Sequence, residues 1–233
     1  MQPNQFDRLE ILVGEDNVKK LHDKKILIVG LGGVGGYVTE SLARSGIGNI
    51  TLVDYDTVDI TNLNRQIIAL HSTIGKKKVD LFKKRITDIN KDCIVNTCDL
   101  FISDDNYLDI FNNEYDFIID CCDSIKAKKL LLKESIERNI NYISSMGTAN
   151  KIDPTKLAIV ELSKTVNDPI AKLMRKYIKD EGIKDKIMVL SSTELPKKNG
   201  NKLGSNPFVP PVAGLLVGNY VVSKLLDNNL QNN

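Results

Sequence analysis

The chain has 233 residues, of which 42% are hydrophobic and 27% are charged. This ordinary globular composition excludes disorder, collagen and coiled coil as descriptions of the whole chain. Lysine and arginine total 32 against 30 acidic residues, a formal net charge of +2. The protein therefore does not coat nucleic acid by bulk charge, although a local basic face remains open.

Five short runs of β-branched and apolar residues are predicted as strands. They lie at 26–29, 50–54, 93–98, 117–120 and 142–145. Helical patterns separate them: one follows a glycine-rich loop and ends at Ala43, and the others lie at 76–90 and 126–138. This alternation predicts an α/β fold with a doubly wound, Rossmann-like and mostly parallel sheet.

The pattern changes after about residue 150. A strand is predicted at 157–162, an amphipathic helix at 169–179, a short strand at 187–190 and a polar loop at 191–207. No linker-like composition separates these elements from the earlier ones. We therefore expect a single domain over 1–233, with a core at 26–150 and a C-terminal elaboration of strands and helices at 151–233.

One long apolar stretch occupies 208–226. It includes two prolines, an asparagine, a serine and a lysine, whereas a membrane-spanning helix needs about 20 apolar residues. We expect a helix that is buried in the protein or lies at a dimer interface. Weak contact with a membrane is the alternative.

The four cysteines are Cys93, Cys98, Cys121 and Cys122, and none forms a Cys-x-x-Cys pair. A structural zinc site needs about four cysteine or histidine ligands at paired spacing, so no zinc is expected. The cysteines are interpreted as reduced core residues of a cytoplasmic protein.

A glycine pattern, Gly30-x-Gly32-x-x-Gly35, lies between the first strand and the first helix. In this context the first glycine permits the turn, the second lets the backbone approach a phosphate, and the third lets the helix pack on the strand. The helix N-terminus then offers free N–H groups to an anion. Asp54 ends the second strand, where its carboxylate can accept from ribose hydroxyls. An adenine nucleotide is predicted, with NAD, FAD and ATP open at this point.

The residues that follow favour ATP. A triphosphate wants a guanidinium and an ammonium, and Arg65 and Lys78 supply them, whereas an NAD enzyme needs neither here. Further along, Asp120 and Asp123 lie at the carboxyl end of the fourth strand, the edge at which ligands bind in open α/β sheets. A carboxylate there can hold the Mg²⁺ that accompanies ATP.

Five motifs, in order over residues 26–125, resemble the ubiquitin-activating-enzyme-like superfamily, whose bacterial members adenylate carboxylates. They are Gly-x-Gly-Gly-Val-Gly, the terminal Asp54, Thr-Asn-x-Asn-Arg-Gln, Gly-Lys-x-Lys-Val and Asp-x-x-Asp. The resemblance implies that 26–150 is the nucleotide-binding core and that 151–233 serves the substrate or a dimer. It implies ATP-binding roles for Gly30, Gly32, Gly33, Gly35, Asp54, Asn62, Arg65, Gln66, Lys78 and Asp123.

Within that set the family assigns the ribose to the equivalent of Asp54, the phosphates to those of Arg65 and Lys78, and the magnesium to that of Asp123. Asn62 and Gln66 are expected to line the same pocket. A monovalent cation is a further candidate cofactor.

The first 25 residues resemble the family's opening helix, an arm whose arginine reaches across a homodimer to the partner's ATP. Arg8 matches that arginine and precedes an amphipathic stretch. The apolar residues expected on one face of that stretch are Ile11, Leu12, Val18 and Leu21. A homodimer is therefore expected, with Arg8, Arg65, Lys78 and Asp123 as the catalytic residues.

Two branches of the superfamily compete. One adenylates the C-terminus of a small sulfur-carrier or ubiquitin-like protein; many of its members carry Cys-x-x-Cys pairs and a cysteine on the crossover loop, which this chain lacks at 182–206. The other is the branch of tRNA threonylcarbamoyladenosine dehydratases. Phrases like those of the second branch lie at 42–48, 145–155, 164–175 and 208–214. The cysteine-free loop at 191–207 argues against a sulfur-relay partner.

The second branch implies an ATP-dependent cyclisation of threonylcarbamoyladenosine in tRNA. The substrate carboxylate becomes an acyl-adenylate, and its own ureido group then closes on it, so no protein nucleophile is needed. A tRNA partner requires basic surface, for which 76–92 and 151–186 are candidates. Activation of a small carrier protein is the alternative function, and a non-catalytic binding subunit is a third hypothesis.

Overall fold

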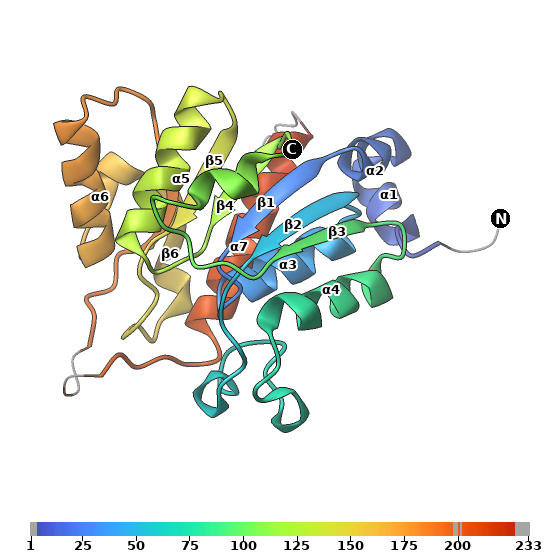
Figure 1. Ribbon diagram of the computed structural model, residues 1–233, viewed down its shortest axis with the longest axis horizontal. Helices are drawn as coiled ribbons and strands as arrows, with labels where there is room; N and C mark the ends of the chain where they lie inside the picture. Colours follow the sequence, from blue (N-terminus) through green and yellow to red (C-terminus); the bar gives the residue numbers. More distant parts are fainter. Residues whose placement is uncertain (1–3, 198–199, 201, 227–233) are drawn as a thin grey trace.

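The computed structural model describes residues 4–197, 200 and 202–226. Its centre is a seven-stranded sheet in the order β3-β2-β1-β4-β5-β7-β6. Every neighbouring pair is parallel except β6 and β7, which are antiparallel. The strands are β1 Lys25–Val29, β2 Asn49–Val53, β3 Ile94–Cys98, β4 Phe117–Asp120, β5 Asn141–Ser145, β6 Leu157–Glu161 and β7 Met188–Ser192. The doubly wound, mostly parallel sheet predicted from the sequence is confirmed (Figure 1).

Helices cover both faces of this sheet (Figure 1). They are α1 Asp7–Val13, α2 Glu15–His22, α3 Gly35–Arg44, α4 Lys78–Ile89, α5 Ile125–Glu137, α6 Pro169–Asp180 and α7 Val209–Leu225. Short 3₁₀ turns lie at Ile60–Asn62, His71–Thr73, Tyr107–Phe111, Pro154–Lys156 and Leu162–Lys164.

Side chains of β1 alternate between the two faces of the sheet and so belong to two different core clusters. Ile26 and Ile28 belong to the core cluster that includes residues of α3, α4 and α7. Leu27 and Val29 belong to a second cluster, which includes Leu131 of α5. Because successive side chains of a strand point to opposite faces, a continuous apolar run is what a strand covered on both sides requires.

The predicted apolar helix at 208–226 is α7, and it packs closely on α3. A Cβ added at Gly214 would lie 2.4 Å from the Val34 carbonyl oxygen, and one added at Gly218 would lie 2.1 Å from Ser41 Oγ. Glycine at these two positions therefore lets the helix axes approach. None of the helices in the described part of the chain is long and apolar enough to cross a membrane.

The N-terminal segment departs from expectation. The predicted amphipathic stretch is two helices, which part at Gly14 with a φ of 92°. Val18 is buried, but Ile11 and Leu12 are 79% and 78% exposed. The prediction of one apolar face is therefore wrong, because the break changes the direction of the chain between the two pairs of residues.

The polar loop predicted at 191–207 also begins too early. Ser191 and Ser192 are buried in β7, which inserts between β5 and β6. Glu194 is buried as well, and its carboxylate accepts backbone hydrogen bonds from Ile152 and Asp153. Polar composition indicated a loop here, but hydrogen bonding satisfies these groups inside the fold.

Candidate nucleotide-binding site

A cavity of about 730 Å³ opens at the carboxyl edge of the sheet. Val29 pairs with Asp120 across β1 and β4, and residues of the loops that follow these two strands line the cavity. The strand order reverses at this point, since β2 and β3 lie on one side of β1 and β4 and β5 on the other. Such a switch point is where ligands bind in open α/β sheets.

The glycine loop after β1 forms one wall. Gly30 has a φ of +88°, and a Cβ there would lie 2.7 Å from the Cys122 backbone nitrogen. Gly32 and Gly33 line the cavity, whereas Gly35 does not. A Cβ on Gly35 would lie 1.8 Å from the Gly30 carbonyl oxygen, so this glycine allows α3 to pack behind the loop. The loop and the N-terminus of α3 can bind a phosphate through backbone N–H groups.

The C-terminal helix also contacts this wall. A Cβ on Gly33 would lie 2.9 Å from Cβ of Pro210, which itself lines the cavity. Pro210 lies in the first turn of α7. Residues 177 positions apart in the chain therefore meet at the glycine loop.

Asp54 follows β2 and lies at the cavity, buried. Its carboxylate accepts hydrogen bonds from the backbone N–H of Leu31 at 2.6 Å and of Asp56 at 2.8 Å. Burial raises the pKa of Asp54 above its ordinary value, against the opposing effects of Lys78 and the two N–H groups. The remaining lone pairs leave this carboxylate able to accept from a ribose.

Lys78 begins α4 and projects into the same cavity. Its Nζ donates to Asp56 Oδ2 at 2.7 Å and lies 3.9 Å from Asp54 Oδ1. The lysine is 3% exposed, whereas the Asp56 side chain is 45% exposed. A buried ammonium held by a half-exposed carboxylate is placed to contact the phosphates of a nucleotide.

Asn62, Arg65 and Gln66 also line the cavity. Asn62 accepts from the Asp59 N–H in a capping box, which fixes the turn that carries the other two. The Arg65 guanidinium donates to the Thr61 carbonyl at 2.8 Å, and the Gln66 side-chain oxygen is buried without a hydrogen-bond partner among the described residues. A buried unpaired amide oxygen at a cavity wall is consistent with a ligand donor there.

Asp123 lines the cavity and is exposed in it, but Asp120 is not part of the lining. Of the two aspartates at the carboxyl end of β4, Asp123 is therefore the one that can face a ligand. Asp120 is the last residue of β4, and its side chain points into the protein, where it is fully buried against Lys128. The alternation of side chains along β4 turns Asp120 inward, whereas Asp123 lies in the loop that follows the strand.

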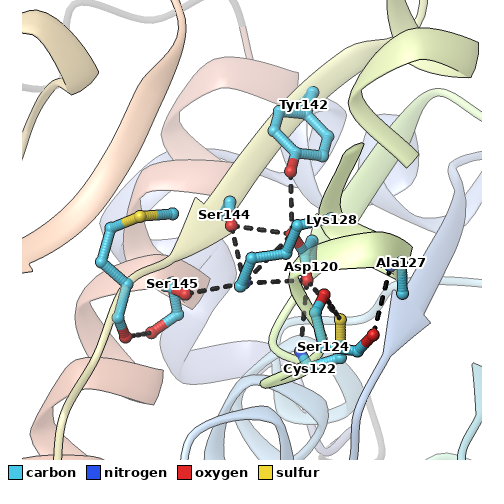
Figure 2. A network of polar contacts seen from close by, with 9 residues as sticks. Asp120, Cys122, Ser124, Ala127, Lys128, Tyr142, Ser144 and Ser145 are labelled. Carbon is cyan, nitrogen blue, oxygen red and sulfur yellow. Dashed lines mark hydrogen bonds and ion pairs between the residues drawn. The ribbon is translucent and has the colours of Figure 1, made fainter. Parts of the chain in front are cut away.

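The partners of Asp120 form a network that sequence reasoning missed (Figure 2). Lys128 of α5 donates to both Asp120 oxygens at 3.1 Å, to Ser144 Oγ at 2.9 Å and to the Ser145 carbonyl at 2.9 Å. Tyr142 and Ser144 also donate to Asp120. One signal was available, since Lys128 shares the helix stripe of Leu131 and Leu132, both fully buried.

Residues 145–149 form another part of the cavity wall. At its far end lies a second buried pair, with Lys151 Nζ 3.5 Å from Asp168 Oδ2. Asp168 accepts from the Gly147 N–H at 2.9 Å and also caps α6 through the Ala171 N–H. Both residues lie in phrases that resemble the dehydratase branch, at 145–155 and 164–175, but nothing in those phrases indicated that the two side chains pair.

Arg8 is exposed on α1 and is not among the residues that line the cavity of its own chain. Cys121 and Cys122 do line the cavity. Burial raises the pKa of the Cys121 thiol to about 12 and that of Cys122 well above its ordinary value. Both are therefore protonated, and not nucleophilic thiolates, at neutral pH.

The donor set of the cavity suits magnesium carried by a nucleotide. In the described ranges of the chain, no group of three or more histidine, cysteine, aspartate or glutamate side chains could hold a metal alone. Mg²⁺ is commonly held by one or two carboxylates together with substrate phosphates. Asp123, exposed in the cavity, can supply such a carboxylate.

Comparison with known proteins agrees with this site. The model of the ThiF family matches residues 6–223. The tRNA threonylcarbamoyladenosine dehydratase of Bacillus subtilis (strain 168) is 45% identical over 96% of this chain and 95% of its own. The crystal structure of the E. coli tRNA N6-threonylcarbamoyladenosine dehydratase, TcdA, in complex with ATP matches with a TM-score of 0.91 and 33% identity, over 98% of this chain and 96% of that one. The molybdopterin-synthase adenylyltransferase of Escherichia coli (strain K12) is 36% identical, over 54% of this chain and 51% of its own.

Proposed function

The chain belongs to the ThiF family, and within it we propose that the protein is an ATP-dependent tRNA threonylcarbamoyladenosine dehydratase. One observation carries this assignment: similarity to a dehydratase extends over 96% of the chain, whereas similarity to a carrier-protein adenylyltransferase covers 54%. The extent of the match thus distinguishes the two branches. Activation of a small carrier protein is the less supported alternative.

The reaction begins by activating a poor electrophile. The threonyl carboxylate attacks the α-phosphate of ATP, which gives an acyl-adenylate and releases pyrophosphate. The glycine loop, Arg65 and Lys78 stabilise the negative charge of the phosphates, and Asp54 orients the ribose. Mg²⁺, held beside Asp123, would supply further charge neutralisation.

The second step is intramolecular. A nitrogen of the substrate's own ureido group attacks the activated carbonyl, loses its proton and expels AMP, which carries away the carboxylate oxygen. The net change in the tRNA is the loss of one water. Tethering of the two groups supplies a high effective concentration, and the protonated thiols of Cys121 and Cys122 agree with a path without a thioester.

The homodimer is part of the proposal. Arg8 lies outside the cavity of its own chain, and the same helix exposes Ile11 and Leu12. Large exposed apolar side chains on one short helix favour contact with a second copy, which would bring Arg8 to the partner's ATP. Mixing Arg8→Ala with Asp123→Ala chains should restore part of the activity, because one site of each heterodimer is then intact.

Fewer lysines and arginines at 76–92 are free to contact tRNA than the number of basic residues in that range suggests. Of the cations at 76–92, Lys78 lies in the cavity, Lys77 pairs with Asp99, and Arg85 pairs with Glu40. Lys76, Lys83, Lys84 and Lys91 are exposed and remain the candidates for phosphate contacts. We propose that the enzyme acts in the cytoplasm, where its tRNA is found. For weak membrane contact and for a monovalent cation, we propose no specific residue.

Two measurements test the function. Titration calorimetry should detect binding of ATP with Mg²⁺ and no binding of NAD. Purified protein with ATP should convert threonylcarbamoyladenosine in tRNA to a nucleoside lighter by one water, with release of AMP, as followed by mass spectrometry. Binding of NAD alone, or an unchanged nucleoside beside an adenylated carrier protein, would refute the assignment.

A further inference from the structure

Lys128 is a fully buried lysine directly behind the nucleotide cavity. It lies in α5, does not line the cavity, and its Nζ has four hydrogen-bond contacts to oxygen (Figure 2). Burying an ammonium costs several kcal/mol unless its partners are well placed. Neighbouring positions on the same stripe hold leucines, so the helix could pack here without a charge.

Through Asp120, Lys128 is connected to the loop that carries Asp123. Asp120, bound by Lys128, accepts from the Cys122 backbone N–H at 3.2 Å and from its Sγ at 3.0 Å. The other side of this peptide rests against Gly30, where a Cβ would come within 2.8 Å of the Cys121 carbonyl carbon. The peptide that joins Cys121 and Cys122, one residue before Asp123, is thus confined between the glycine loop and the Asp120 carboxylate.

Through Ser145, Lys128 is also connected to the cavity wall at 145–149. Lys128 Nζ donates to the carbonyl of Ser145, the residue at which β5 ends and the cavity wall begins. The same ammonium binds Ser144 Oγ, which donates in turn to Asp120. A single charged group therefore ties two cavity walls that belong to different strands.

We propose that Lys128 is a positioning residue that, through Asp120, fixes the loop bearing Asp123 and so sets the contribution of Mg²⁺ to ATP binding. The inference rests on the proposed function for its ligand, ATP with Mg²⁺. Lys128 itself is fully buried and does not line the cavity, so its effect on the ligand must act through Asp120. A misplacement of about 1 Å can cost a factor of about 10² in rate, so the position of a group such as the Asp123 carboxylate matters closely. We therefore expect a relaxed loop to lose its contact with the metal before the protein loses the nucleotide.

The test compares ATP affinity with and without Mg²⁺ by calorimetry on the full chain. The main variant is Asp120→Asn/Lys128→Met, which removes the two opposite charges together and avoids leaving one of them buried alone. Asp123→Asn gives the result expected when the carboxylate is lost. Lys151→Met is the matched control, because it removes another buried lysine paired with an aspartate behind the same cavity, away from the Asp123 loop.

We expect Mg²⁺ to tighten ATP binding by about tenfold or more in the wild type and in Lys151→Met, the size of one hydrogen bond to a charged group. In the double variant, as in Asp123→Asn, the factor should fall to about twofold or less, while binding of ATP without metal stays within about threefold of wild type. A tenfold effect that survives in the folded double variant, or is lost equally in Lys151→Met, would overturn the inference. So would a wild type whose ATP affinity ignores Mg²⁺.

If the double variant does not fold, Lys128→Arg carries the test. It keeps the charge, but its planar fork cannot reproduce four contacts from one nitrogen. We then expect a partial loss of the Mg²⁺ effect, and full retention would contradict the proposal. No measurement here uses tRNA, so failure to dehydrate tRNA would refute the proposed function alone, whereas an unchanged Mg²⁺ effect would refute the role of Lys128 alone.

Discussion

Two buried lysine–aspartate pairs hold the cavity wall at 145–149, one near each end. In the first, Lys128 and Asp120 have fully buried side chains, and the lysine has hydrogen bonds to three residues. In the second, the side chains of Lys151 and Asp168 are 2% and 0% exposed, but their nearest atoms are 3.5 Å apart. The Lys151 nitrogen has no hydrogen-bond partner in the described part of the chain.

The two pairs match in charge and burial and differ in geometry. The desolvation cost of a buried ion pair is offset only when its remaining donors and acceptors are also satisfied. We therefore infer that the first pair stabilises the wall, whereas the second adds little beyond what Asp168 gains from the N–H groups of Gly147 and Ala171.

The largest expected effect breaks the first pair. Lys128→Met leaves the Asp120 carboxylate buried without its cation, and the free energy of unfolding should fall by about 3–5 kcal/mol. Adding Asp120→Asn should recover most of that loss, because no unpaired charge then remains. Urea unfolding of the two variants measures both numbers, and a double variant as unstable as the single one would contradict the explanation.

The next effect concerns a lysine–aspartate contact that is open to the cavity. Lys78→Met should weaken ATP binding by about 10–100-fold, because a charged hydrogen bond to a phosphate is worth about 1.5–3 kcal/mol. Calorimetry with ATP measures it. Lys76→Met is the control, since that lysine is exposed and absent from the cavity lining, and its ATP affinity should stay at the wild-type value.

A smaller effect is expected at the second buried pair. Lys151→Met removes an ammonium without hydrogen bonds, and Asp168 keeps two N–H donors. The free energy of unfolding should fall by about 1–2 kcal/mol, well below the loss in Lys128→Met. Equal losses in the two lysine variants would show that hydrogen-bond geometry does not govern the difference between the pairs.

The smallest effect is expected at Glu40, which is buried but pairs with Arg44 and Arg85, whose side chains are 60% and 37% exposed and therefore screened by water. Burial alone would raise the pKa of Glu40, but hydrogen bonds from Arg85 and Arg44 outweigh it and hold the pKa below its ordinary value of 4.5. A lowered acid pKa stabilises the fold above the unfolded value, and this contribution is lost as the pH falls through the folded value. Glu40→Gln should therefore cost about 1 kcal/mol or less at pH 7 and less than that near pH 3. Unfolding curves at the two pH values test it, and a loss that is as large in acid as at neutral pH would contradict the assignment.

Sequence patterns predicted the parts of this molecule that local chemistry determines. The apolar runs of β1 and β4 and the glycine loop follow from residue type and spacing, and the structure places Asp54, Arg65 and Lys78 together at the cavity, as the motif order indicated. The insertion of β7 between β5 and β6 could not be predicted, since strand order depends on long-range packing.

Which charged side chains are buried was harder to predict from the sequence than the strand order. Asp120 and Asp123 look equivalent in sequence, and only the pleat of β4 turns one inward. Lys128 lies among Lys126 and Lys129 in a helix whose lysines look solvated, although its apolar stripe could have identified it. Lys151 follows a turn without periodicity, so no sequence signal marks it as buried.

The contact between Gly33 and Pro210 has a consequence for the order of synthesis. Translation at about 5–20 residues per second makes the glycine loop roughly 9–35 s before the first turn of α7. A nascent chain that has reached α6 thus carries every residue of the phosphate loop but not the proline that packs against it. We therefore expect ATP to bind best to the finished wall, so that the nucleotide would stabilise the completed fold and offer little to the growing chain.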